Sequence, residues 1–241
     1  MSFYGEDLAY IHDAGFTSLA VLAADRLIEE LHRLSKGGLV VELGCGSGVA
    51  ASRLGAAGFD VVGIDASPAM LALARKRAPR AIFVEESFVS AEIPPCDAVL
   101  AAGEVFNSLD DTANTSKALE RVFARVFKAL WPGGLFMLDV AGPGRIAGGG
   151  PVTSTWVGTD CAVISTAVEA PKRATLTRSA TTLRKVDGRI RMGEEVHAQR
   201  LIPAARVLEL LRKAGFKVRT LQGYDGERFA PGHSVFAARR P

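Results

Sequence analysis

The segment with the clearest chemical meaning is residues 41–48, which read Val-Glu-Leu-Gly-Cys-Gly-Ser-Gly. It lies between a short apolar run, residues 39–43, and a helical pattern, so its glycines stand where a strand turns into a helix. Glycines at such a turn let a ligand approach the backbone, and the first N–H groups of the helix have no partner within it. Asp65 ends the next apolar run, where a carboxylate can accept both hydroxyls of a ribose. Together these residues predict a site for a ribose-containing cofactor.

Two details bear on which cofactor such a loop binds. The dinucleotide fingerprint is G-x-G-x-x-G, but here the third glycine comes one position early, at Gly48, and Val49 stands in the last place. Glu42 would repel a pyrophosphate, whereas it suits a ligand with an ammonium and a sulfonium. S-adenosylmethionine has both cations, a ribose and no phosphate, so it is the expected cofactor, with S-adenosylhomocysteine as its product. A nicotinamide-dependent oxidoreductase stays open as the alternative.

Residues 42–48 resemble the first motif of class I S-adenosylmethionine-dependent methyltransferases, and residues 63–70 (Gly-Ile-Asp-Ala-Ser-Pro-Ala-Met) resemble their second. The likeness extends over residues 39–140. It implies a set of cofactor contacts, in which the glycine loop surrounds the methionyl part and an acid holds its amino group, directly or through water. The implied residues are Gly44, Cys45, Gly46 and Gly48 for the methionyl part, Glu42 for the amino group, Asp65 for the ribose, Ala66, Met70, Ser87 and Phe88 for adenine, and Gly103 and Glu104 beside the sulfonium.

The elements that must position these residues alternate along the chain. Apolar runs at residues 39–43, 59–64, 81–84, 98–102 and 135–140 predict buried strands. Between them, residues 68–78 and 115–130 have helical periodicity, as do residues before 37 and after 203. Such alternation is typical of a parallel sheet with helices on both faces. The expected fold is α/β, a Rossmann-like, seven-stranded, mostly parallel sheet whose last two strands form the antiparallel hairpin that the resemblance implies.

Residues 152–202 have a different character, with Thr, Val, Ile and Arg alternating at period two. An Asp-Gly pair within residues 186–189 predicts a hairpin turn. We therefore expect an antiparallel β insertion after the fifth strand. The whole chain, residues 1–241, is interpreted as one methyltransferase domain. Its parts are an N-terminal lid and helix (1–36), a cofactor-binding core (37–142 and 203–241) and an inserted lid for the acceptor (152–202).

Methyl transfer from a sulfonium is an in-line displacement, so alignment of donor and acceptor supplies much of the catalysis, and a hydroxyl acceptor also needs a general base. Tyr10 and His12 alternate around one residue in the N-terminal segment, and His197 shares a strand face with Glu195 and Gln199. These are the candidate catalytic residues. Asn107, just after the fourth strand, is expected to face the pocket mouth and to bind the acceptor.

The segment after the fourth strand, Gly103 to Phe106, lacks the Asn or Asp followed by Pro-Pro that is typical of methyltransferases acting on bases or glutamine amides. The position of the β insertion instead resembles that of sugar amine and glycine N-methyltransferases. We therefore expect a small-molecule acceptor that is methylated on nitrogen or oxygen. The alternative from a different functional class is a protein that binds S-adenosylmethionine but catalyses no reaction.

Composition narrows the expected partners. The chain has 241 residues and a net charge of +3, with no run of basic residues, which disfavours nucleic acid and an RNA methyltransferase. Its three cysteines lack metal-site spacing, so neither a disulfide nor a metal is expected, and a reducing cytoplasm fits. No apolar stretch reaches the roughly 20 residues that span a bilayer. A monomer or a homodimer is expected.

Overall fold

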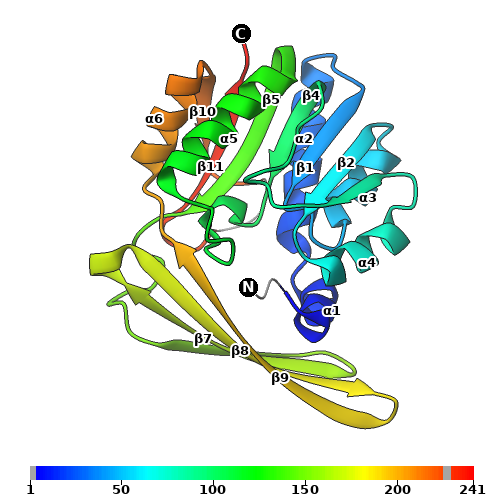
Figure 1. Ribbon diagram of the computed structural model, residues 1–241, viewed down its shortest axis with the longest axis vertical. Helices are drawn as coiled ribbons and strands as arrows, with labels where there is room; N and C mark the ends of the chain where they lie inside the picture. The colour runs from blue at the N-terminus through cyan, green and yellow to red at the C-terminus, as the bar shows by residue number, and fades with distance from the viewer. Residues whose placement is uncertain (1–3, 225–228) are drawn as a thin grey trace.

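The computed structural model describes residues 4–224 and 229–241. Its larger sheet has seven strands in the order β10-β11-β5-β4-β1-β2-β3, and all neighbours are parallel except at β11, which is antiparallel to both β10 and β5 (Figure 1). The expected mostly parallel sheet and its final antiparallel hairpin are therefore confirmed. The strands are β1 (Leu39–Leu43), β2 (Asp60–Asp65), β3 (Ile82–Glu85), β4 (Cys96–Ala101), β5 (Leu130–Ala141), β10 (Lys217–Leu221) and β11 (His233–Arg239).

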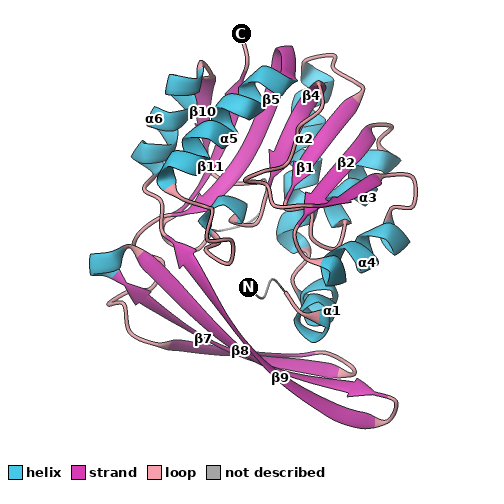
Figure 2. Cartoon of the chain, viewed as in Figure 1, coloured by secondary structure: helices cyan, strands magenta, loops and turns pink. Residues whose placement is uncertain are grey.

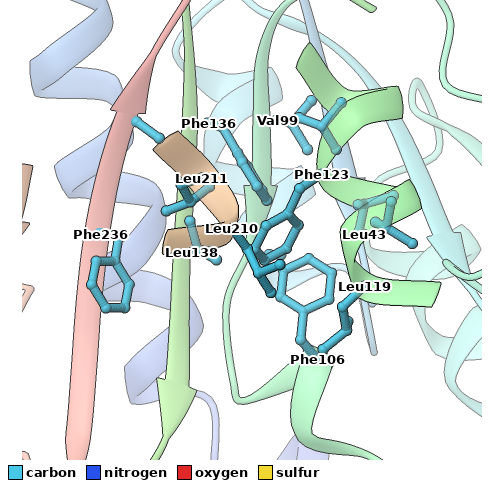
Figure 3. Packing of buried hydrophobic residues seen from close by; sticks show 14 of the residues in the cluster. Leu43, Val99, Phe106, Leu119, Phe123, Phe136, Leu138, Leu210, Leu211 and Phe236 are labelled. Carbon is cyan, nitrogen blue, oxygen red and sulfur yellow. The ribbon is translucent and has the colours of Figure 1, made fainter. Parts of the chain in front are cut away.

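Helices cover both faces of this sheet (Figure 1). The helices α2 (Ser18–Arg33), α3 (Val49–Ala56) and α4 (Pro68–Arg77) lie on one face, and α5 (Ser116–Ala129) and α6 (Ala204–Ala214) lie on the other. Figure 3 shows the second of these layers, in which leucines and phenylalanines of α5, α6 and the strands pack together. Local signals fix the helix ends: Ser67 caps α4, Thr115 caps α5, and Gly215 ends α6 with φ 106°.

The insertion forms a second sheet of four antiparallel strands in chain order (Figure 2). They are β6 (Val152–Val157), β7 (Cys161–Ala170), β8 (Thr175–Val186) and β9 (Arg189–Arg200). The Asp-Gly turn joins β8 to β9, with φ 49° at Asp187 and 77° at Gly188, as a two-residue hairpin requires. The structure also contains two short 3-10 helices, η1 (Val105–Asn107) and η2 (Pro171–Arg173). An isolated bridge between Ser108 and Gln199 joins the insertion to the core.

An additional helix, α1 (Glu6–Gly15), packs between the core and the insertion (Figure 1). The sequence interpretation placed a lid here, without a helix. On one side Asp7 forms ion pairs with Arg184 and Arg191 of the insertion. On the other side Arg77 of α4 pairs with Asp13 and also donates to the backbone oxygen of Ser47 at 2.7 Å. The helix therefore connects the insertion to the glycine loop.

Candidate active site

A cavity of about 250 Å³ lies where the parallel strands of the larger sheet end. Its walls come from the glycine loop after β1, the ends of β2 and β4, the beginning of α2, helix α1 and the inner face of the insertion. In open α/β sheets, ligands bind outside the carboxyl ends of the strands, so the cavity occupies the position expected for a ligand site.

The glycine loop has a backbone that only glycine adopts without strain. Gly44, Gly46 and Gly48 have φ values of 67°, 51° and 74°. A Cβ atom on Gly44 would lie 2.6 Å from a methyl group of Val105, and one on Gly48 would lie 2.9 Å from the Cα of Ala74. The glycines thus allow both the turn and the close packing of the loop against η1 and α4.

Glu42 is a buried carboxyl with one oxygen atom that lacks a partner. It is 4% exposed, and its Oε2 atom has no hydrogen bond within the described ranges. Burial, with the nearby Asp65 carboxylate as a second cause, raises the pKa of Glu42 from 4.5 to about 8. Because an unpartnered buried carboxylate is unfavourable, this site favours a cationic ligand. The ammonium of S-adenosylmethionine fits that requirement.

Asp65, at the end of β2, holds together the glycine loop and the turn that precedes α4. Its carboxylate accepts hydrogen bonds from the N–H groups of Gly46 and Ser67, both at 2.8 Å. Burial raises its pKa, although these backbone hydrogen bonds oppose the shift. Each carboxylate oxygen has a second lone pair, so the same group can accept ribose hydroxyls while it holds the loop.

The side chains expected around adenine line one part of the cavity. Ser87 donates to Asp111 and accepts from the N–H of Val89 at 3.1 Å, so its hydroxyl is fixed. The ring of Phe88 packs edge-on against the buried Phe106 with centroids 5.3 Å apart. The cavity-lining residues in this part are Ala66, Met70, Glu86, Ser87 and Phe88, and Cys45 lines it from the glycine loop.

The turn after β4 is held in an uncommon conformation. Gly103 has φ 92° and Glu104, which is not glycine, has φ 63°. The buried carboxylate of Asp139 stabilises this turn, since it accepts the N–H of Gly103 at 2.9 Å, the N–H of Glu104 at 2.6 Å and the hydroxyl of Tyr224 at 2.9 Å. The Glu104 side chain lines the cavity, paired with Arg145.

The insertion supplies the opposite wall through His197. Its Nδ1 atom lies 2.7 Å from Asp110 and its Nε2 atom 3.2 Å from Glu195. The hydrogen bond with Asp110 raises the pKa of His197 more than partial burial lowers it. The ring of Tyr4 packs against the imidazole with centroids 4.8 Å apart. Gln199, on the same strand face, donates to Glu104 at 3.0 Å and so connects this wall to the turn after β4.

Three predicted site residues do not line the cavity: Tyr10, Asn107 and Gly48, and Gly48 instead lets the glycine loop pack against α4. Tyr10 donates to Asp160 at 2.8 Å and lies under the guanidinium of Arg184, so it attaches α1 to the insertion. Residues two apart diverge by about 200° around a helix, so the reasoning that kept Tyr10 together with His12 was wrong, and only His12 faces the cavity. The prediction for Asn107 is also wrong. It is fully buried, and its amide bonds the backbone of Ala141 at 2.7 and 2.9 Å.

Several cavity residues escaped the sequence interpretation. Tyr4, Asp110, Asp111 and Arg178 all line the cavity. Asp110 and Asp111 follow η1 in an irregular loop, where no periodicity indicates direction. Asp139 was visible as a single acid inside an apolar strand, and such an acid needs several buried donors.

Comparison with known proteins identifies the family. Residues 40–134 match the family described as "Methyltransferase domain". YqeM of Bacillus subtilis (strain 168), which is named as a methyltransferase, is 26% identical over 212 residues, covering 84% of each chain. The chain contains a class I S-adenosylmethionine-dependent methyltransferase domain. The methyl donor follows from that domain, and the matched segment contains both motifs of the cofactor side.

Solved structures share the complete fold of this methyltransferase. CalS10 from Micromonospora echinaspora, described as an amino pentose methyltransferase, superposes with a TM-score of 0.77 at 19% identity, covering 100% of this chain and 99% of its own. The sugar N-methyltransferase KedS8 from Streptoalloteichus sp ATCC 53650 gives a TM-score of 0.78 at 20% identity, with coverages of 100% and 96%.

Within the described ranges, no helix has the length and hydrophobicity that a membrane crossing requires.

Proposed function

We propose that this methyltransferase acts on a small-molecule acceptor, on nitrogen or oxygen, by in-line displacement, and that nitrogen is the favoured target. The observation that carries the proposal is the single cavity that joins the glycine loop to the inner face of the insertion. A donor held at the loop and an acceptor held at the insertion would share one cavity. The amino pentose methyltransferase and the sugar N-methyltransferase among the structural neighbours support this choice of acceptor class.

On the cofactor side, the bound S-adenosylmethionine would supply an electrophilic methyl group on its sulfonium. We assign the amino group of its methionyl part to Glu42, whose unpartnered Oε2 atom supports the assignment. Asp65 would accept the ribose hydroxyls. The remaining contacts are assigned to Gly44, Cys45, Gly46 and Gly48 for the methionyl part, Ala66, Met70, Ser87 and Phe88 for adenine, and Gly103 and Glu104 for the region of the sulfonium.

On the acceptor side, we assign proton transfer to His197 and the two carboxylates that flank it. An amine reaches the site as an ammonium, and it must lose a proton before its lone pair can attack. Asp110 lines the cavity and lies 2.7 Å from the Nδ1 atom of His197, so a proton accepted at Asp110 can be shared with the imidazole. The carboxylate of Asp110 favours a cationic amine over a neutral alcohol at this part of the wall. His12 would take part in binding, because its Nδ1 atom is buried without a hydrogen-bond partner among the described residues.

Residues 1–36 and 152–202 would act together as the lid. Support comes from the contacts between them: the N–H of Gly5 donates to Glu195 at 3.2 Å, and Asp7 pairs with Arg184. The backbone oxygen of Tyr4 also accepts from Ser67 at 2.8 Å, next to the proposed ribose site. Closure of these two segments over the core would exclude water from the transfer step.

The proposal is tested by binding and by turnover. Calorimetry should detect S-adenosylhomocysteine binding to the wild type and at least tenfold weaker binding to D65A. A panel of small amines and their matched alcohols is then incubated with S-adenosylmethionine while release of S-adenosylhomocysteine is followed. We expect turnover of amines and a loss of at least 100-fold in kcat for H197Q without a change in cofactor affinity. Turnover of alcohols alone, or full activity of H197Q, would contradict the assigned roles.

A further inference from the structure

The inner wall of the insertion carries a cation that has no counterion. Arg178 of β8 is the direct cross-strand partner of His197 of β9, so both side chains project from the same face of the insertion, and both line the cavity. Within residues 4–224 and 229–241, the Arg178 side chain makes no hydrogen bond or ion pair. Arg184, on the same strand, pairs instead with Glu6 and Asp7. The guanidinium of Arg178 is therefore available to a ligand.

Two further donors lie beside Arg178. His12 lines the cavity, and its Nδ1 atom is buried without a hydrogen-bond partner in the described chain. Tyr4 also lines the cavity, and its ring centroid lies 5.5 Å from that of His12. Arg178 is close enough to act electrostatically on both rings. An imidazole, a phenol and a guanidinium thus converge, and each can donate a hydrogen bond to an anion.

The neighbouring carboxylates do not neutralise this corner, because each is engaged elsewhere. Glu104 pairs with Arg145 and accepts from Gln199. Asp110 bonds to His197, and Glu195 accepts the N–H of Gly5 and contacts the other nitrogen of His197. Among the residues that the structure describes, Arg178 is therefore a cation of this wall that no carboxylate pairs with. A guanidinium in that position is suited to hold a carboxylate or a phosphate through two parallel hydrogen bonds.

We infer that Arg178, with Tyr4 and His12, binds an anionic group, a carboxylate or a phosphate, that the methyl acceptor carries. All three residues lie in the N-terminal segment or the insertion, outside the core segments with the cofactor motifs, which assigns the anion to the acceptor. The inference rests on the proposed function and deepens it. The acceptor is an amine whose nitrogen lies near the His197 wall and whose carboxylate or phosphate is held by Arg178.

Binding of simple anions tests the corner directly. The full-length protein is saturated with S-adenosylhomocysteine and titrated with inorganic phosphate, and separately with acetate, by calorimetry. The wild type should bind at least one probe, and the preferred probe identifies the phosphate or the carboxylate. R178Q should bind it at least tenfold more weakly, and R178K should recover part of the affinity. R189Q, which removes an exposed arginine of β9, is the matched control and should bind as the wild type does. Absence of anion binding by the wild type, or equal binding by R178Q, overturns the inference.

A second arm asks whether the anion belongs to the cofactor. R178Q should bind S-adenosylhomocysteine within twofold of the wild type, because Arg178 is assigned to the acceptor. A tenfold loss that is absent for 5′-methylthioadenosine, which has no carboxylate, would assign Arg178 to the methionine carboxylate and overturn the inference. Failure of the proposed function would be seen separately, as wild-type protein that binds S-adenosylhomocysteine and anions but methylates no amine.

Discussion

Replacing Glu42 with glutamine should stabilise the cofactor-free protein at pH 8 while it weakens cofactor binding. In the folded protein the Glu42 carboxyl has a pKa of about 8, raised from 4.5 first by burial and then by Asp65. In the unfolded chain the same carboxyl ionises near pH 4.5. Between these pH values the folded state holds a proton that the unfolded state has lost. The contribution of Glu42 to the free energy of unfolding therefore falls as pH rises through this range.

The size of the effect follows from the two pKa values. Each pH unit in this range lowers the free energy of unfolding by about 1.4 kcal/mol. Since Glu42→Gln has no charge to lose, its stability relative to the wild type should increase by about 3.5 kcal/mol between pH 5 and pH 8. Urea denaturation of the cofactor-free proteins at one-unit intervals measures this difference. Glu194→Gln, the same carboxyl-to-amide change on the exposed side of β9, is the matched control.

Cofactor binding should show the opposite dependence. A cationic ligand stabilises the ionised carboxylate, so binding of S-adenosylhomocysteine at pH 7 should release about 0.9 proton through Glu42. The affinity should rise about ninefold from pH 6 to pH 7. Calorimetry in buffers of different ionisation enthalpy measures the release, which Glu42→Gln should abolish. A binding enthalpy independent of the buffer, or a stability difference that stays constant from pH 5 to pH 8, would refute the reasoning.

Three further predictions concern the elements around the site. Gly48→Ala should lower the free energy of unfolding by about 2–4 kcal/mol, because its Cβ would meet the backbone of α4. The control Gly58→Ala has open space around it, so its free energy of unfolding should fall only by the cost of a positive φ. Equal losses of the two variants in urea denaturation would contradict this. Asp139→Asn should cost about 2–4 kcal/mol in the same assay, because the turn after β4 loses acceptors for buried donors. Asp7→Asn should speed proteolysis within α1 at pH 7. Partial burial acts to raise the pKa of Asp7, but hydrogen bonds from Arg191 and Arg184 outweigh it and hold this pKa below its usual value. The cleavage rate of the wild type should therefore approach that of the variant only below pH 4, where Asp7 becomes protonated. A cleavage rate unaffected by the substitution would show that these contacts do not hold α1.

The core of the fold and the position of the glycine loop were predictable because their signals are local. A strand that turns into a helix around Gly44 and Gly48 requires positive φ values, and glycine marks those positions in the sequence. The alternation of apolar runs and helical periods indicated the parallel sheet without any knowledge of contacts. The position of Asp65 at the cavity was predictable from a local signal as well, because this residue directly ends a buried strand.

The acceptor side depends on contacts that one-dimensional patterns do not contain. Helix α1 begins at Glu6, and its N-cap residue, Gly5, offers no capping side chain. The position of the helix depends on ion pairs with strands far along the chain. That Arg178 lies beside His197 follows from the register between β8 and β9. The side chain of Asn107 turns away from the cavity because the backbone of Ala141 requires an amide partner there. Each of these outcomes is set by tertiary packing.

The position of β11 in the larger sheet has a consequence for the order in which the chain folds. Residues 233–239 pair with β5 on one side and β10 on the other, and β5 is separated from them in sequence by the whole insertion and α6. A growing chain therefore completes all four strands of the insertion while β5 still has a free apolar edge. Such an edge is open to pairing with other chains until the last strand arrives. Chains that end before residue 233 should accordingly aggregate, even though every residue that lines the cavity has already been synthesised.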